Sequence, residues 1–133
     1  MELPDFDQIF TNYQNEIVQD IRVDELSLKD KAMIIPTIKH KWVARMMIHK
    51  SQLKKFADAK KKAIRAISAN QPVALSKQAV DQATFNNPDI IKLSECIEKL
   101  ETLIEYLEKV EKLTSSLTFD CKNVIDLQKL ETT

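Results

Sequence analysis

The sequence predicts an all-α protein made of long amphipathic helices, with a basic helical unit near the N-terminus and coiled-coil-like oligomerisation helices near the C-terminus. Its 133 residues include no glycine, although average usage of ~7% would supply about nine. Helix interiors disfavour glycine by ~1 kcal/mol relative to alanine, so a chain without it is typical of long helices. Apolar residues also recur at spacings of three and four along most of the chain, as amphipathic helices require.

The first expected helix is short and acidic. Pro4 suits its first turn, and Asp5, Asp7 and Glu16 lie off its apolar face. That face comprises Phe6, Ile9, Phe10, Tyr13, Ile17 and Ile21. The pattern predicts an amphipathic helix.

A second helix is expected to begin near residue 25. Asp24 is one candidate N-cap, and Ser27 with Asp30 forms a weaker capping pattern. Pro36 lacks a backbone donor and disfavours the α conformation of Ile35. We therefore expect a kink or a break at these two residues.

Residues 36–68 are expected to form one helix of about nine turns. Its apolar stripe comprises Ile38, Trp42, Met46, Leu53, Phe56, Ala57, Ala63, Ile64 and Ile67. Ten cations share this helix with a single acid, Asp58, between residues 39 and 65. These candidate DNA-binding residues are Lys39, Lys41, Arg45, Lys50, Lys54, Lys55, Lys60, Lys61, Lys62 and Arg65.

The charges are segregated along the chain, although the formal net charge is zero. Residues 1–30 carry two basic and eight acidic side chains, residues 31–81 carry twelve and two, and residues 82–133 carry six and ten. A basic helix face is often only solvated, but this asymmetry favours a polyanion-binding surface.

A junction is expected between the basic helix and the C-terminal part of the chain. Residues 69–88 carry two prolines and three asparagines with weak periodicity, which predicts loops around one short helix after Ser76. We therefore divide the chain into a DNA-binding unit at residues 1–70, a junction at 71–87 and an oligomerisation unit at 88–133.

The C-terminal unit is expected to begin with Asn87 as N-cap and Pro88 at the first helical position. Two adjoining apolar seams follow, which favour a multi-helix bundle or a ring of protomers. The candidate oligomerisation residues are Ile90, Leu93, Ile97, Leu100, Leu103, Ile104, Leu107 and Val110. A terminal helix from about Asp120 to Leu130 is expected to lock this assembly.

The aromatic and titratable residues of the basic helix suggest no catalytic site. Trp42 lies on the apolar stripe, so we expect it to pack in the core or an interface rather than stack on bases. His40 and His49 are nine residues apart, which is not the spacing of a helical metal pair. We expect both at the surface, at most as minor phosphate contacts.

The composition also excludes several classes of protein. At 44% hydrophobic residues the chain is too apolar to be wholly disordered, and no run approaches the ~20 apolar residues of a membrane span. The N-terminus, MELPDFDQIF, lacks the features of a signal peptide. We therefore expect a cytoplasmic protein, with Cys96 and Cys121 as reduced thiols.

Two stretches of the sequence show an ordered pattern. Residues 21–66 contain an Ile–Asp-containing lead, a helix ending in the Lys41–Trp42 pair and a Lys-rich helix. Residues 87–131 contain an amphipathic helix followed by Phe119, a polar turn and an Ile–Asp segment. Together they resemble the UvsY proteins, the recombination mediators of large tailed phages, over nearly the whole chain.

The resemblance implies a ring-like homo-oligomer of six or seven subunits that binds single-stranded DNA. It implies that this ring helps load a RecA-like phage recombinase onto DNA covered by a single-strand-binding protein. It also implies no bond chemistry and no cofactor, and, for a phage-encoded protein, action in the host cytoplasm.

The resemblance also carries over to particular residues. By position, the Lys–Lys pair that precedes the family's DNA-binding Lys–Ala–Arg–Leu motif falls on Lys60 and Lys61. The motif itself falls on residues 65–68, where Arg65 replaces the lysine and Ile67 replaces the arginine. One expected DNA contact is therefore missing, and Lys62 is the extra cation that can reach the same phosphates.

Two other classes of function stay open at this point. A basic amphipathic helix can lie on an anionic membrane, but the acidic segments on both sides argue against that. The chain can also be an oligomeric coiled-coil adaptor whose basic helix binds an acidic protein partner. An enzyme has the least support, because no paired carboxylates, nucleophile with a base or metal cluster can be assigned, and phosphate-cradling loops need glycine.

Overall fold

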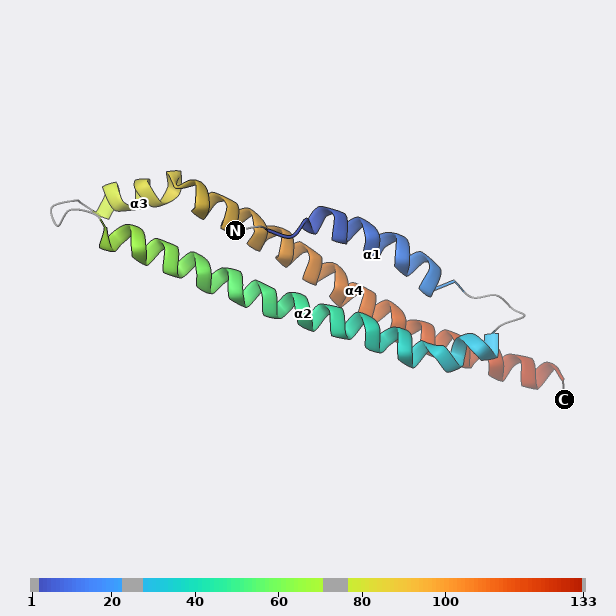
Figure 1. Ribbon diagram of the computed structural model, residues 1–133. Helices are drawn as coiled ribbons and strands as arrows, with labels where there is room; N and C mark the ends of the chain where they lie inside the picture. The colour runs from blue at the N-terminus through green and yellow to red at the C-terminus, as the bar shows by residue number, and fades with distance from the viewer. Residues whose placement is uncertain (1–2, 23–27, 71–76, 133) are drawn as a thin grey trace.

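The computed structural model describes residues 3–22, 28–70 and 77–132. Within these ranges the chain forms four helices and no strand, which confirms the predicted all-α fold. The helices are α1 (Phe6–Asp20), α2 (Leu28–Ala69), α3 (Lys77–Asn86) and α4 (Pro88–Glu131). The two long helices, α2 and α4, give the molecule its elongated shape (Figure 1).

The framework of the fold is the pair α2 and α4, which run in opposite directions side by side (Figure 1). The main core lies between them and α1, and its buried members are Phe6, Ile17, Trp42, Met46, Cys96, Leu100, Leu103, Leu107 and Val110. A smaller cluster towards the C-terminal end of α4 joins Leu28, Ile35 and Cys121. Burial of these residues is the main force that holds the long helices together.

α1 lies alongside the two long helices and packs against both of them (Figure 1). Its Phe10 ring meets Tyr106 of α4 edge-on, with the ring centroids 4.9 Å apart. The N-cap is Asp5, whose Oδ1 accepts a hydrogen bond from the Gln8 backbone N–H at 3.1 Å. Pro4 therefore precedes the helix, and its predicted place in the first turn is wrong.

α2 continues through Pro36 without interruption. The predicted alternative of a break at Ile35 and Pro36 is therefore wrong, whereas the alternative of a kink stays a prediction. A proline removes one helical hydrogen bond, but Leu28 and Ile35 are both buried in the cluster with Cys121. This packing stabilises the first turns of α2. The predicted N-caps Asp24 and Ser27 lie outside the described residues.

α4 is one helix from Pro88 to Glu131, so the separate terminal helix expected from Asp120 is also wrong. The buried positions of α4 continue beyond the eight candidate oligomerisation residues to Thr114 and Cys121. Thr114 donates its hydroxyl hydrogen to the Glu111 carbonyl at 2.8 Å, which satisfies a buried polar group within the helix.

The junction follows the prediction in two respects. α3 is the short helix expected after Ser76. α4 begins at Pro88 with Asn87 as its N-cap, and the Asn87 Oδ1 accepts from the backbone N–H groups of Asp89 and Ile90 at 2.9 and 3.3 Å. Both features are therefore confirmed.

The eight candidate oligomerisation residues lie mainly inside the single chain. Seven of them are buried, namely Ile90, Leu93, Leu100, Leu103, Ile104, Leu107 and Val110, and Ile97 is partly buried. Their first role is therefore to hold α4 in the fold of one chain. The functional division into units at 1–70 and 88–133 stays a prediction, since both units contribute to one core.

Among the helices of the described ranges, none has a stretch that is both long and apolar enough to cross a membrane.

Candidate nucleic-acid interface

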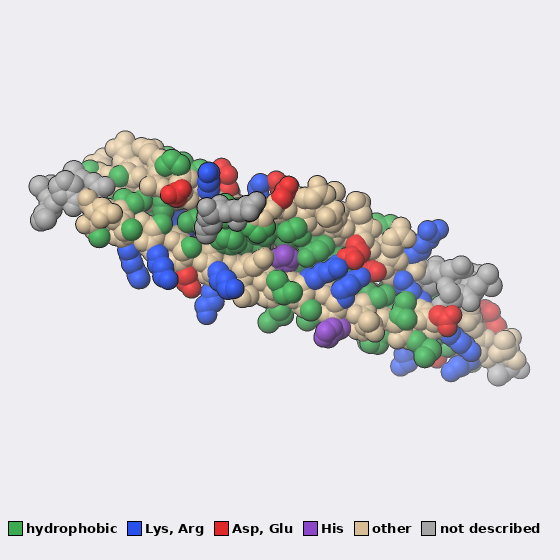
Figure 2. Space-filling model, in the orientation of Figure 1, with side chains coloured by type: hydrophobic (Ala, Val, Ile, Leu, Met, Phe, Trp, Pro, Cys, Tyr) green, Lys and Arg blue, Asp and Glu red, His purple; other side chains and the backbone are tan. Residues whose placement is uncertain are grey.

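The ten candidate DNA-binding cations all lie on α2, but the structure divides them into groups. Five of them are exposed and make no ion pair with any described residue, and we call them the outer cations. The outer cations are Lys54, Lys55, Lys61, Lys62 and Arg65. Figure 2 shows basic side chains projecting in a row from α2 towards the end that carries α3.

Helical periodicity gathers the outer cations on one side of α2. Lys54 and Lys61 are seven residues apart, as are Lys55 and Lys62, and seven residues make about two full turns. Arg65 follows Lys61 by four residues. The row spans about 16 Å at 1.5 Å per residue. Such an unneutralised row is suited to bind several consecutive phosphates of one strand.

Lys41 and Arg45, the inner cations, are instead covered by α1. The Lys41 Nζ lies 2.7 Å from Asp20 Oδ2 and 3.6 Å from Glu16 Oε1. Both terminal nitrogens of Arg45 donate to the Glu16 carboxylate. This hydrogen bonding lowers the pKa of Glu16 and raises the pKa of Arg45. The acidic helix α1 therefore already neutralises the inner cations.

Aromatic rings add to the contacts of the inner cations. The Arg45 guanidinium carbon lies 5.0 Å from the Tyr13 ring centroid and 4.8 Å from that of Trp42. Lys41 Nζ lies 5.3 Å from the Trp42 centroid. Cations over such ring faces are attracted by the ring quadrupole, so Lys41 and Arg45 serve the docking of α1.

The remaining three candidates have intermediate positions. Lys50 is exposed, but its Nζ lies 3.8 Å from Glu108 Oε1 of α4. Lys39 and Lys60 are partly buried, and Lys60 lines a pocket between helices. The DNA-binding role of all ten cations stays a prediction, and the outer cations are its best-placed members.

Trp42 lies in the core, as the sequence predicts. It is only 1% exposed, and its indole Nε1–H donates to Asp20 Oδ2 at 2.8 Å. The Tyr13 ring meets it edge-on at 5.4 Å between centroids. Its indole is therefore not available to stack on a base.

The surface position predicted for His49 is wrong. The side chain is 4% exposed, with Nε2 2.8 Å from Tyr13 Oη and Nδ1 2.7 Å from Gln52 Oε1. Because an amide oxygen only accepts, Nδ1 carries the hydrogen and Nε2 accepts from Tyr13. His49 follows Trp42 by seven residues, so the apolar stripe could have indicated its burial. His40 is exposed, as predicted.

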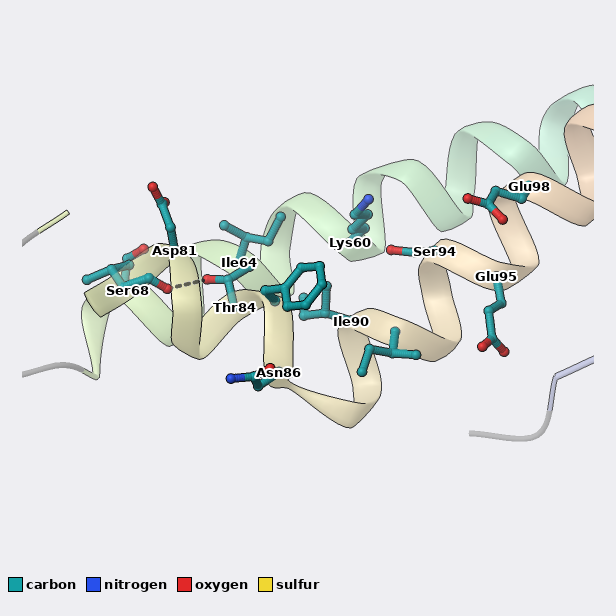
Figure 3. A pocket seen from close by; sticks show the side chains of 13 residues that line it. Lys60, Ile64, Ser68, Asp81, Thr84, Asn86, Ile90, Ser94, Glu95 and Glu98 are labelled. Atoms are coloured by element: carbon teal, nitrogen blue, oxygen red, sulfur yellow. Dashed lines mark hydrogen bonds between the residues drawn. The ribbon is translucent and has the colours of Figure 1, made fainter. Parts of the chain in front are cut away.

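A pocket of about 740 Å³ lies at the α3 end of the molecule, between α2, α3 and α4 (Figure 3). Ile64 and Ile90 form part of its apolar lining, and Phe85 of α3 is 78% exposed at this site. Asp81, Glu95 and Glu98 are acids that also line it. These carboxylates repel phosphate, so the outer side of α2 suits a nucleic-acid backbone better than this pocket. No pattern in the sequence indicates this pocket.

Position 67, where the resemblance leads one to expect an arginine, holds a partly buried isoleucine. Ile67 lines a small pocket with Ala83 of α3 and Asn87, so it contributes to packing at this end. Arg65 and Lys62 are exposed nearby on the same helix. They are the cations that this chain offers around the motif position.

The fold is that of a recombination mediator of known structure. Two crystal structures share it, with TM-scores of 0.81 and 0.79 and sequence identities of 17% and 16%. Each match covers 92% of this chain, and they cover 98% and 97% of the other chain. Both are of the bacteriophage T4 recombination mediator protein UvsY. The resemblance drawn from the sequence is thereby confirmed at the level of the fold. No protein-family model matches the sequence, and no curated protein sequence matches it.

Proposed function

We propose that this protein is a single-stranded-DNA-binding recombination mediator that acts as a ring-like homo-oligomer. In this role it helps load a RecA-like recombinase onto DNA covered by a single-strand-binding protein, in the cytoplasm of a phage-infected host. The fold shared with UvsY supports this proposal. The observation that carries it is the row of five exposed outer cations without ion-pair partners among the described residues.

Counterion release supplies the driving force for strand binding. Each neutralised phosphate contributes about −0.7 to the log–log salt slope of single-strand binding, so five contacts give about −3.5 per chain. A fourfold rise in salt then weakens binding about 100-fold for each engaged chain. A ring repeats the row once per subunit, so weak sites act together through high effective concentration.

A strand held along such a ring presents its backbone in an extended form that a filament-forming recombinase can capture. The protein needs no cofactor for this role, because it only binds and shapes the strand. Monomeric variants that load recombinase as well as the native protein would contradict this mechanism.

Equilibrium binding to a fluorescent single-stranded oligonucleotide, beside the matching duplex, tests the proposal. The outer-cation variant replaces Lys54, Lys55, Lys61, Lys62 and Arg65 with glutamine. The control variant makes the same charge change at five other exposed lysines, Lys29, Lys92, Lys112, Lys122 and Lys129. We expect tight, salt-dependent and strand-preferring binding that the outer-cation variant loses and the control retains. Weak binding that is indifferent to strandedness and to the outer cations would overturn the proposal.

A second candidate function is an oligomeric adaptor whose basic helix binds an acidic protein partner. The contacts of Lys41 and Arg45 with Glu16 and Asp20 favour it, because α2 already binds an acidic helix within this chain. An adaptor would bind DNA weakly and without dependence on strand length, so the same titration separates the two functions.

A further inference from the structure

The pocket between α2, α3 and α4 has no role in strand binding, yet it has the size of a ligand site. Its volume of about 740 Å³ lies within the range of about 300–1,000 Å³ that is typical of such sites. Residues four apart share one face of a helix, and each helix lines the pocket with such a pair. The pairs are Ile64 with Ser68 on α2, Asp81 with Phe85 on α3, and Ile91 with Glu95 on α4. The pocket therefore depends on the packing of α3 against both long helices.

The apolar part of the lining is only partly covered by the chain itself. Ile90 is 5% exposed, whereas Ile91 is 44% exposed and Phe85 is 78% exposed. An aromatic ring contributes a large apolar area when a partner covers it, and exposed apolar groups beside a hollow are typical of binding sites. The pocket can therefore take up an apolar side chain from outside and cover Phe85 at the same time.

Three carboxylates surround this apolar part. Figure 3 shows Asp81 on the α3 side of the pocket and Glu95 and Glu98 on the α4 side. None of the three makes an ion pair with any residue that the structure describes. Lys60 is the only basic residue among the described side chains of the lining. Three acids against one lysine leave the pocket negative, so it attracts cations and repels anions.

We infer that this pocket binds a short segment of a partner protein in which an apolar side chain is flanked by lysines or arginines. The apolar side chain packs against Phe85 and Ile91, and the flanking cations pair with the carboxylates. Glu95 and Glu98 are three residues apart, which places their Cβ atoms about 5–6 Å from each other, and Asp81 belongs to another helix. Carboxylates spread in this way match several cations of a peptide better than the single charge of a small molecule.

Two other occupants match the pocket less well. The carboxylates repel the phosphates of a nucleic acid. The most basic stretch of a second copy of this chain lacks the apolar group, because the exposed large apolar side chains of the described ranges include none between Lys54 and Arg65. The site goes beyond the proposed function, since it uses acidic and apolar residues that strand binding does not use.

Fluorescence anisotropy with a labelled synthetic peptide tests the site. The peptide carries leucines flanked by arginines. One reference peptide has glutamates in place of the arginines, and the other has serines in place of the leucines. The first reference tests the need for positive charge, and the second tests the need for the apolar side chains.

The protein variants compare matched positions inside and outside the pocket. Phe85→Ala removes the exposed ring, and Phe119→Ala is its control, because Phe119 is 69% exposed on α4 and does not line the pocket. The acid variant combines Asp81→Asn, Glu95→Gln and Glu98→Gln. Its control makes the same charge change at exposed acids outside the pocket, with Glu101→Gln, Asp120→Asn and Glu131→Gln. All of these side chains are exposed, so circular dichroism should show native helix content in every variant.

We expect the native protein to bind the leucine–arginine peptide and neither reference peptide. Phe85→Ala and the acid variant should each weaken this binding about tenfold, because one loses the apolar contact and the other loses three ion pairs. Both control variants should bind the peptide as the native protein does. Added salt should weaken binding to the native protein more than binding to the acid variant.

Other outcomes overturn the inference in distinguishable ways. Binding that is unchanged in Phe85→Ala and in the acid variant would place the peptide elsewhere, and a native protein that does not bind the peptide would exclude this ligand. Equal binding of the serine peptide would show attraction by charge alone. A change of mass in either pocket variant, measured by light scattering after size exclusion, would show that a second copy of this chain covers the pocket. The proposed function is tested separately, because both pocket variants keep the outer cations.

Discussion

Leu107 distinguishes a residue that holds one chain together from a residue that joins two chains. It is 0% exposed and lies in the main core with Trp42 and Leu103. Leu107→Ala removes a fully buried branched side chain, so the lost transfer energy and the resulting cavity together cost about 3 kcal/mol. For a chain of 133 residues this lowers the melting temperature by about 10 °C.

Urea unfolding at several protein concentrations measures this effect, with Ile91→Ala on the same helix as the control. Ile91 is exposed, so its truncation is expected to cost less than about 1 kcal/mol. The Leu107→Ala loss should be the same at every concentration, because it acts within one chain. A loss of stability that appears only at protein concentrations where the native protein is assembled would contradict this reasoning. It would place Leu107 in an interface between subunits.

Two further predictions concern the region that α1 covers. The bond from Arg45 lowers the pKa of Glu16, so Glu16 contributes stability above its unfolded pKa and loses it as pH falls through the folded value. Urea midpoints should therefore fall more steeply between about pH 5 and pH 3 in the native protein than in Glu16→Gln; equal slopes would contradict the role of this pair. The fluorescence of Trp42, the single tryptophan, should resist quenching by acrylamide, and its emission should stay unchanged when single-stranded DNA binds. A shift of the emission on DNA binding would indicate that the indole contacts the strand.

The helices could be predicted because their signals are local. Three- and four-residue spacing located α1, α2 and α4, and Asn87 with Pro88 marked the start of α4. The pattern did not show that α4 continues without a break through Asp120 to Glu131. Cys121 in this stretch packs against Leu28 and Ile35, which are distant from it in sequence.

The candidate site could be predicted in part. Counting charges placed the cations on one helix, but it could not show that Lys41 and Arg45 face Glu16 of α1. The spacing of the apolar seam in α4 fits a neighbouring chain as well as it fits α2, so periodicity could not choose between them. The prediction for His49 was wrong because its buried ring makes hydrogen bonds with Tyr13 and Gln52. A sequence pattern cannot show that a polar side chain finds such partners in the core.

The central claim is that the outer cations allow this protein to act as a recombination mediator, and a filament-assembly assay tests it most directly. Single-stranded DNA is first covered with single-strand-binding protein, and a RecA-like recombinase is then added with the native protein, the outer-cation variant or the five-lysine control variant. The account predicts that the native protein and the control accelerate filament formation on covered DNA and that the outer-cation variant does not. Equal acceleration by all three proteins, or no acceleration by the native protein, would contradict it.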